Sequence, residues 1–244
     1  MMKRIVFPFL SAAMLLFSGC MDTGGNSQCF EYQPLIVGFS YEMFQPTIIF
    51  GKNQYIAPDL QDKFFSEIDE GDALIANFCI DYDQQPYAGY TTVYNLQYAK
   101  VETAWPQATT GGESNAGDFN YPIENVEILG INNYVLFLGL IHQAPTDQKF
   151  TYEMTYDRSY NSEDAAETPA VYIRAKNVND SSSSKTDLYV FYSFNLSSFL
   201  WYHKGSDNKV VFRIFYKTGV DDEGNDEYKE YLLPNNEPIW VTVE

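Results

Sequence analysis

The sequence has few cysteines, few histidines and few basic side chains. Its 244 residues include three Cys, two His and 15 Lys or Arg against 33 Asp or Glu, which gives a formal net charge of −18. A chain this acidic repels phosphate groups, so we predict that it does not bind nucleic acid. Two histidines offer little material for a metal site or for a base that works at neutral pH. We therefore predict no cofactor and no metal site.

The surroundings of the two histidines do not resemble a catalytic site. His142 ends an apolar run, His203 follows an aromatic run, and no Ser or Cys nucleophile elbow accompanies either of them. Two carboxylates could serve glycoside hydrolysis, but among 33 acidic residues any pair would be an arbitrary choice. We predict that the protein is not an enzyme and keep an unrecognised hydrolase as an alternative.

The one strongly apolar run lies at the N-terminus. Residues 5–17 are apolar except for Pro8 and Ser11, and this is shorter than the roughly 20 residues that a membrane-spanning helix needs. Basic residues precede the run and Ser18-Gly19-Cys20 follows it, a pattern typical of a secretory signal. The ending resembles a bacterial lipobox, with Phe17 at a position where Leu is usual. Residues 1–19 are therefore predicted to be a lipoprotein signal peptide.

Cys20 is the residue that we predict to be lipidated. Each buried methylene contributes about 0.8 kcal/mol, so two or more acyl chains hold a protein stably on a membrane. Removal of residues 1–19 leaves 13 basic against 33 acidic residues, a net charge of −20. We expect a protein that is anchored to a membrane through Cys20 and does not span it. Residues 20–29, which are polar and glycine-containing, are predicted to be a flexible tether.

The other two cysteines leave their redox state open. Cys29 and Cys79 could form a disulfide in an oxidising compartment, or they could remain free thiols. The sequence does not supply the distance between their Cβ atoms, on which a disulfide depends.

Residues 30–102 are predicted to form a small β-domain. Strands are expected over 35–39, 47–50, 55–57, 73–82 and 91–101, with a turn at 51–54. Asp59 could cap a short helix that places Leu60, Phe64 and Ile68 on one face. In the strand over 73–82, alternate apolar residues share one face, and Cys79 points to the other.

Residues 103–121 are rich in Gly, Ser and Asn and are predicted to be a linker. Residues 122–244 then show a series of short alternating strands with turn signals, which favours an antiparallel β-sandwich. The run over 134–142 is apolar on both faces, so we expect it to be a central strand. One helical turn is expected near residues 195–200.

Three motifs resemble segments of the NigD-like lipoproteins of anaerobic Gram-negative bacteria. They are GDALIANF at 71–78, VYIRAKN at 171–177 and FYSFNLSSF at 191–199, where Asn195 replaces the family's Asp. Their order and spacing match across most of the chain after the signal peptide. The resemblance implies an all-β protein with a small OB-like β-barrel followed by a β-sandwich. It also implies that Cys20 anchors the protein in the envelope of a Gram-negative bacterium, in the outer rather than the inner membrane. An immunity role has been suggested for the protein that gives the family its name, and no residue here carries that suggestion over.

Two further features were weighed as ligand sites. The acidic run DDEGNDE at 221–227 could coordinate calcium, but its spacing does not fit the twelve-residue calcium loop and favours a hairpin turn. A sugar could stack on the aromatic residues least fixed by strand periodicity, although we expect each of them to pack in the core or against a loop; they are Trp105, Trp201, Trp240, Tyr87 and Tyr90.

Taken together, the sequence predicts a non-catalytic binding or scaffolding lipoprotein. The partners expected are the membrane, through Cys20, and a protein or glycan ligand. Two alternatives remain within this class: an immunity-type protein that binds a protein toxin, and a glycan-binding accessory lipoprotein.

Overall fold

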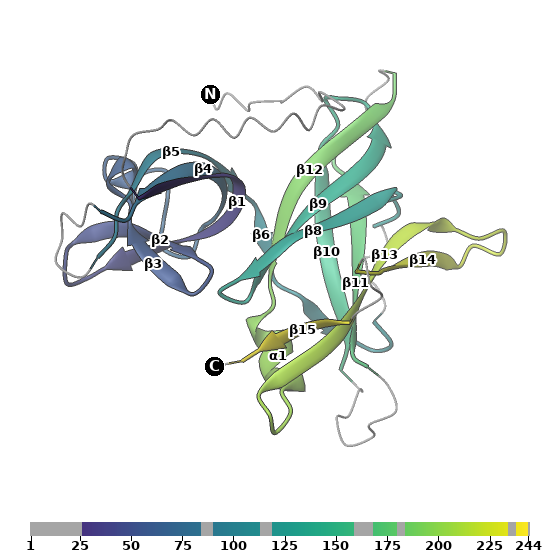
Figure 1. The fold of residues 1–244 in the computed structure, drawn as a ribbon. Coiled ribbons are helices and arrows are strands. Elements are labelled where there is room, and N and C mark those ends of the chain that lie inside the picture. Colours follow the sequence, from purple (N-terminus) through teal and green to yellow (C-terminus); the bar gives the residue numbers. More distant parts are fainter. Residues whose placement is uncertain are drawn as a thin grey trace.

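Three β-sheets make up most of the computed structural model, which describes residues 26–83, 90–112, 119–158, 168–179, 184–233 and 238–243. Strands from the first part of the chain form one sheet, and strands from the remainder form two facing sheets (Figure 1). The prediction of an all-β protein is confirmed. No helix among the described residues is long and apolar enough to cross a membrane.

The first sheet has five strands in the order β3-β2-β1-β4-β5. They are β1 (Ser27–Ser40), β2 (Gln45–Phe50), β3 (Asn53–Ile56), β4 (Ala73–Asp81) and β5 (Val93–Val101). The predicted barrel is not closed by a strand ladder. The end of β3 meets the residues just before β5 at one bridge, where Ile56 pairs with Thr92 and Ile56 N–H donates to Thr91 O over 3.0 Å. Because β3 is only four residues long, the sheet stays partly open, as five-stranded OB-folds are.

One face of this sheet is apolar, as the alternation along β4 predicted. Leu74, Phe78 and Ile80 are fully or almost fully buried in a shared core with residues of β1, β2 and β3. Cys79 points away from that core, and Cys29 lies directly opposite it on β1. The two form a disulfide with 3.9 Å between their Cα atoms, which settles the alternative that the sequence left open.

The helix predicted after Asp59 is instead a 3-10 turn, η1 (Pro58–Leu60), followed by tight turns. Leu60, Phe64 and Ile68 are buried as predicted. The Asp59 carboxylate caps no helix, because its Oδ2 accepts a hydrogen bond from Leu96 N–H over 2.9 Å. Phe65 has a φ of 65°, a backbone conformation that ends a right-handed helix.

The two facing sheets form the predicted β-sandwich. One has the order β14-β13-β11-β10-β7, with β15 also paired to β13, and the other has the order β6-β12-β9-β8. Their strands are β6 (Thr103–Ala104), β7 (Gln107–Thr109), β8 (Asn125–Asn132), β9 (Val135–Ala144), β10 (Phe150–Asp157), β11 (Ala170–Asn177), β12 (Thr186–Asn195), β13 (Lys209–Val220), β14 (Asp226–Tyr231) and β15 (Ile239–Thr242). The helix α1 (Ser197–His203) follows β12 at one end of the sandwich (Figure 1).

The sandwich differs in two ways from the prediction. Three of its strand pairs are parallel rather than antiparallel: β7 with β10, β6 with β12, and β11 with β13. In addition, part of the predicted linker is not a linker, because β6 and β7 lie within residues 103–121. A polar segment can form an edge strand, because an edge strand requires backbone hydrogen bonds to one neighbour and does not require buried side chains.

A separate apolar cluster joins the first sheet to the sandwich. Val135 and Phe137 of β9 pack against Ile36, Ile75 and Val101 of the first sheet. The alternate residues of β9 lie in the sandwich core instead, so both faces of this strand are buried, as its sequence predicted. Beside the cluster, the Asn132 amide donates to Ile49 O over 2.6 Å and to Pro34 O over 3.2 Å.

The start of the chain is only partly described. Residues 27–29, assigned by sequence to the tether, belong to β1 and pair with β4. The whole predicted signal peptide (residues 1–19), Cys20 and the tether up to residue 25 lie outside the described residues.

Candidate functional site

Both histidines lie in the core of the sandwich. His142 is fully buried; its Nδ1–H donates to Pro122 O and its Nε2 accepts from the Tyr152 hydroxyl, each over 2.8 Å. Its ring also stacks on Phe150, with 4.1 Å between centroids. Burial disfavours the imidazolium and lowers the pKa of His142 to about 4. A neutral ring held on both nitrogens inside a core has no direct access to a substrate.

His203 also is a packing residue. It is the last residue of α1, 6% exposed, and its ring contacts Phe199 and Tyr156. Burial lowers its pKa to about 4. The apolar and aromatic runs that preceded the two histidines in the sequence were thus the signature of core strands and a core-facing helix.

Four charged side chains gather beneath the β13–β14 hairpin. Arg174 and Lys217 are 3% and 1% exposed. Arg174 donates to Thr155 and to Gly112 O over 2.7 Å each, and its guanidinium lies 3.7 Å from Glu153 and from Asp226. Lys217 is paired with Asp226 over 2.5 Å. Since the two cations face two carboxylates of the same chain, this cluster holds strands together.

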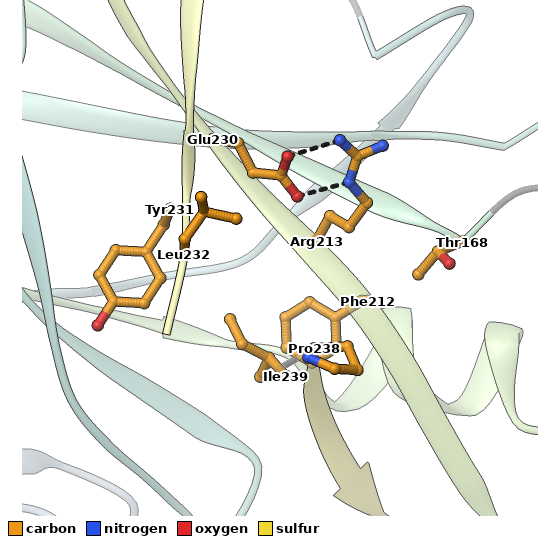
Figure 2. A pocket seen from close by; sticks show the side chains of 8 residues that line it. All are labelled: Thr168, Phe212, Arg213, Glu230, Tyr231, Leu232, Pro238 and Ile239. Atoms are coloured by element: carbon orange, nitrogen blue, oxygen red, sulfur yellow. Dashed lines mark hydrogen bonds and ion pairs between the residues drawn. The ribbon is translucent and has the colours of Figure 1, made fainter. Parts of the chain in front are cut away.

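A small pocket lies between the ends of β13, β14 and β15 (Figure 2). Phe212 and Ile239 form part of its apolar wall. On one side Arg213 and Glu230 form a bidentate ion pair, in which Nε donates to Oε1 over 2.6 Å and Nη2 donates to Oε2 over 2.7 Å. Its volume is about 170 Å³, below the range of roughly 300–1,000 Å³ typical of small-molecule sites. Among the described residues, the one cation and the one carboxylate that line it, Arg213 and Glu230, already bind each other.

The acidic run at 221–227 is a turn, as the sequence favoured. Asp221 Oδ1 accepts hydrogen bonds from the N–H groups of Glu223 and Asn225 over 2.9 and 2.8 Å. Its Oδ2 accepts one from the Asn225 amide over 3.0 Å, and Gly224 has a φ of 85°. The carboxylate that begins the run is thus used to close the loop.

The tryptophans were predicted to be packing residues, and this prediction is wrong. Trp105, Trp201 and Trp240 are 56–60% exposed. They lie after β6, on α1 and on β15, and no ring contact between described residues joins any two of them. Lys204 and Lys209 cover one face of Trp201 and Trp240 respectively. Tyr90 donates to Glu42 over 3.2 Å, and Tyr87 lies outside the described residues.

The most exposed large apolar side chains lie elsewhere, at one end of the first sheet. Among the described residues Phe65, Phe44 and Tyr41 rank highest, at 78%, 73% and 69% exposed. Tyr41 and Phe44 belong to the turn between β1 and β2, and Phe65 belongs to the turn after η1. Phe39 links the two turns, because its ring centroid lies 5.2 Å from that of Tyr41 and 6.1 Å from that of Phe65. We call Phe39, Tyr41, Phe44 and Phe65 the aromatic patch.

The backbone at this patch is strained. Phe44 and Phe65 have φ values of 52° and 65°, in the left-handed region, which costs a residue with a bulky side chain about 1–2 kcal/mol. Neither ring recovers this cost by burial, since both are mostly in water. Backbone strain of this kind clusters at active sites, ligand clamps and switch regions.

Two acidic side chains, Glu42 and Glu70, border the patch. The Tyr41 hydroxyl donates to Glu70 Oε2 over 2.8 Å, and Glu42, next to Tyr41, accepts from Tyr90. Residues 30–102 contain eleven acidic and three basic side chains. Of the basic ones, Lys100 is paired with Asp72 over 2.6 Å and Lys63 lies over the Tyr98 ring. The patch is thus an apolar surface with a negative rim.

Sequence reasoning did not single out this patch. The available signal was that Phe65 falls off the face shared by Leu60, Phe64 and Ile68, and that Phe44 stands between two strands. A bulky aromatic that no periodicity accounts for has no assigned place in a core, although the sequence could not show that Phe39 brings Tyr41 and Phe65 together.

Comparisons with known proteins give matches in structure only. No protein-family model matches the sequence, and no curated protein matches it. An uncharacterised protein from Parabacteroides merdae superposes with a TM-score of 0.69 and 16% identity, over 87% of this chain and 98% of its own. A putative toxin-related protein from Parabacteroides distasonis gives 0.51 and 15%, over 84% and 93%.

A NigD-like immunity protein from Bacteroides caccae covers 89% of this chain and 98% of its own, with a TM-score of 0.50 and 12% identity. These likenesses extend over both the first sheet and the sandwich. The resemblance predicted from the motifs at 71–78, 171–177 and 191–199 is therefore confirmed at the level of the fold: this chain has the fold of the NigD-like proteins.

Proposed function

We propose that the protein is a non-catalytic binding lipoprotein, anchored through Cys20 in the outer membrane of a Gram-negative envelope. The observation that carries the binding role is the aromatic patch, in which Phe44 shares a turn with Tyr41 and the Phe65 ring approaches that of Phe39; Phe44 and Phe65 are both exposed and have positive φ. The burial of His142 and His203 in the sandwich core supports a non-catalytic role. The short apolar leader ending in Ser18-Gly19-Cys20 supports the anchor.

The anchor is tested by the substitution Cys20→Ser. We expect the parent protein to fractionate with membranes and to carry acyl chains by mass spectrometry, and the variant to lose both properties. Ser27→Ala, in the strand that follows the tether, is a matched control that should leave the fractionation unchanged. A parent protein without acyl mass would contradict the proposal.

The face of the outer membrane on which the protein is anchored determines which ligands are accessible to it. Protease shaving of intact cells should degrade the protein if it faces the medium and spare it if it faces the periplasm. A periplasmic control protein must survive the same treatment. Surface exposure would favour an external ligand, and protection would favour a partner within the envelope.

A role in immunity is a more specific candidate within the same class. It is supported by the fold shared with a NigD-like immunity protein and with a putative toxin-related protein. The corresponding experiment expresses the chain in a sensitive strain that is challenged with the product of any toxin gene adjacent to its own. Survival that depends on Cys20 would support this role, and undiminished killing would contradict it.

A further inference from the structure

We propose that the aromatic patch is a docking surface for a polypeptide segment that is apolar at its centre and basic at its edges. This inference rests on the proposed binding function and names its partner class. Three large aromatic side chains, those of Tyr41, Phe44 and Phe65, are held in water by the backbone of their turns, and this exposure is unfavourable unless a partner covers it.

The geometry of the patch favours docking over passive exposure. The turn that carries Phe65 is tightly bonded: Phe65 N–H donates to Ile68 O over 2.8 Å, and Glu67 N–H donates to Lys63 O over 2.9 Å. The adjacent Phe64 is buried in the core of the first sheet, with its ring 4.4 Å from that of Phe65. Phe65 is thus fixed to the core at its base while its own ring is 78% exposed.

The chemistry of the patch favours a polypeptide over a glycan. Phe39, Phe44 and Phe65 have no polar atom to bond to sugar hydroxyls, and Tyr41 already donates its hydroxyl to Glu70. The rings do not lie flat in one plane either, since Phe39 meets Tyr41 at 75° and Phe65 at 50°. Tilted apolar rings form notches that fit Leu-, Ile- or Phe-like side chains.

The charge around the patch sets the sign of the partner. Glu42 and Glu70 are exposed and border the patch, and the net charge of residues 30–102 is −8. Oppositely charged rims speed association and exclude partners of like charge. An anionic lipid surface would be repelled in the same way, so the complementary partner is a segment with Lys or Arg flanking its apolar side chains.

The test measures binding of a fluorescent amphipathic Lys/Leu peptide to the full-length lipoprotein in zwitterionic nanodiscs, with empty nanodiscs as the blank. The decisive variant is Phe65→Asn. Asn tolerates a positive φ better than Phe does, so the variant should be at least as stable as the parent while its affinity for the peptide falls about tenfold or more. The matched control is Trp240→Ser, which removes an exposed aromatic ring from the sandwich rather than from the patch, and it should leave the affinity unchanged.

Charge is tested separately. The double variant Glu42→Gln/Glu70→Gln should weaken binding and reduce its dependence on salt, and a Glu/Leu peptide of the same pattern should bind at least tenfold more weakly. Equal binding of both peptides, or unchanged binding by Phe65→Asn, would overturn the proposal.

Other occupants of the patch would also be detected. Flotation of the Cys20→Ser chain with vesicles, lost in Phe65→Asn, would identify the patch as a lipid-contacting surface. Self-association lost in the same variant would identify a second copy. Either result would overturn the assignment to a basic-edged segment but leave the anchored, non-catalytic role intact. Unaltered fractionation of Cys20→Ser would overturn the lipid anchor whatever the peptide does.

Discussion

The disulfide between Cys29 and Cys79 lies near the start of β1, the first strand of the described chain. Cys29 lies in β1, nine residues after Cys20, and it is exposed, so thiol reagents can reach it. In the proposed anchored form, any pull transmitted by the tether would act first on this end of β1. We predict that replacing both cysteines in Cys29→Ser/Cys79→Ser loosens the first sheet.

The size of the effect follows from the loop that the disulfide closes. The two cysteines are 50 residues apart, and the loop-closure entropy that they remove from the unfolded chain corresponds to about 4 kcal/mol at 25 °C. For a cooperative unit of this length, each kcal/mol shifts the melting temperature by about 2–4 °C. We therefore expect a decrease of about 8–16 °C in the melting temperature.

The assay is thermal unfolding followed by circular dichroism on residues 21–244, oxidised, with and without dithiothreitol. Since Val135 and Phe137 couple the first sheet to the sandwich, we expect one transition. Dithiothreitol should lower the melting temperature of the parent to that of the double variant and leave the variant unaffected. A difference between oxidised and reduced parent of less than about 3 °C would refute the reasoning from loop closure.

Two further predictions concern the sandwich. Gly139→Ala would place a Cβ 1.8 Å from the Tyr189 hydroxyl, so we expect the free energy of unfolding, measured in urea, to fall by about 1–3 kcal/mol. The control Gly219→Ala, whose Cβ would have no neighbour closer than 3.8 Å, should lower it much less. Equal losses for the two variants would contradict the prediction. His142 has a pKa of about 4 in the folded protein against 6.5 in the unfolded chain. As the pH falls, the unfolded chain is therefore protonated at a higher pH than the folded protein, and the contribution of His142 to the free energy of unfolding is fully present only above pH 6.5. It should fall by up to about 3 kcal/mol as the pH drops from 6.5 to 4; the His142→Phe variant should show a smaller fall over this range, and an unchanged slope would refute the assignment.

The coupling between the first sheet and the sandwich bears on how the patch could act. The apolar cluster around Phe137 joins the two parts from the side of β8 and β9, while the aromatic patch belongs to the β1–β2 turn and the turn after η1. Binding at the patch therefore does not require the interface to open. The Asn132 bonds to Pro34 O and Ile49 O further fix the first sheet on the sandwich.

Strand positions were largely readable from the sequence, because a strand with one buried face must alternate. The alternation along residues 73–82 located β4 and put Cys79 on the face opposite Leu74 and Phe78. The absence of alternation along 134–142 identified β9 as a strand buried on both faces. Boundaries differed from the predictions by a few residues, as at the tether, where residues 27–29 already pair with β4.

Predictions failed where local pattern and tertiary contact disagree. Leu60, Phe64 and Ile68 have helical spacing and are buried, but the positive φ of Phe65 interrupts the helix. Residues 103–109 have loop composition but pair as edge strands with β12 and β10. Trp240 was expected to pack inward and is exposed on β15, because a single large ring in a short edge strand can face either side.

The sequence by itself determined the strand content, the acidic charge and the resemblance to the NigD-like proteins, because composition and short periodicities are local properties. It also predicted the leader that ends at Cys20. Tertiary structure alone decided the pairing of Cys29 with Cys79, the burial of both histidines and the convergence of Phe39, Tyr41 and Phe65. Each of these depends on which strands and turns become neighbours, and that depends on contacts between residues far apart in the chain. The candidate binding surface belongs to this second group, since its members come from the end of β1 and from two turns that are brought together only by the folding of the first sheet.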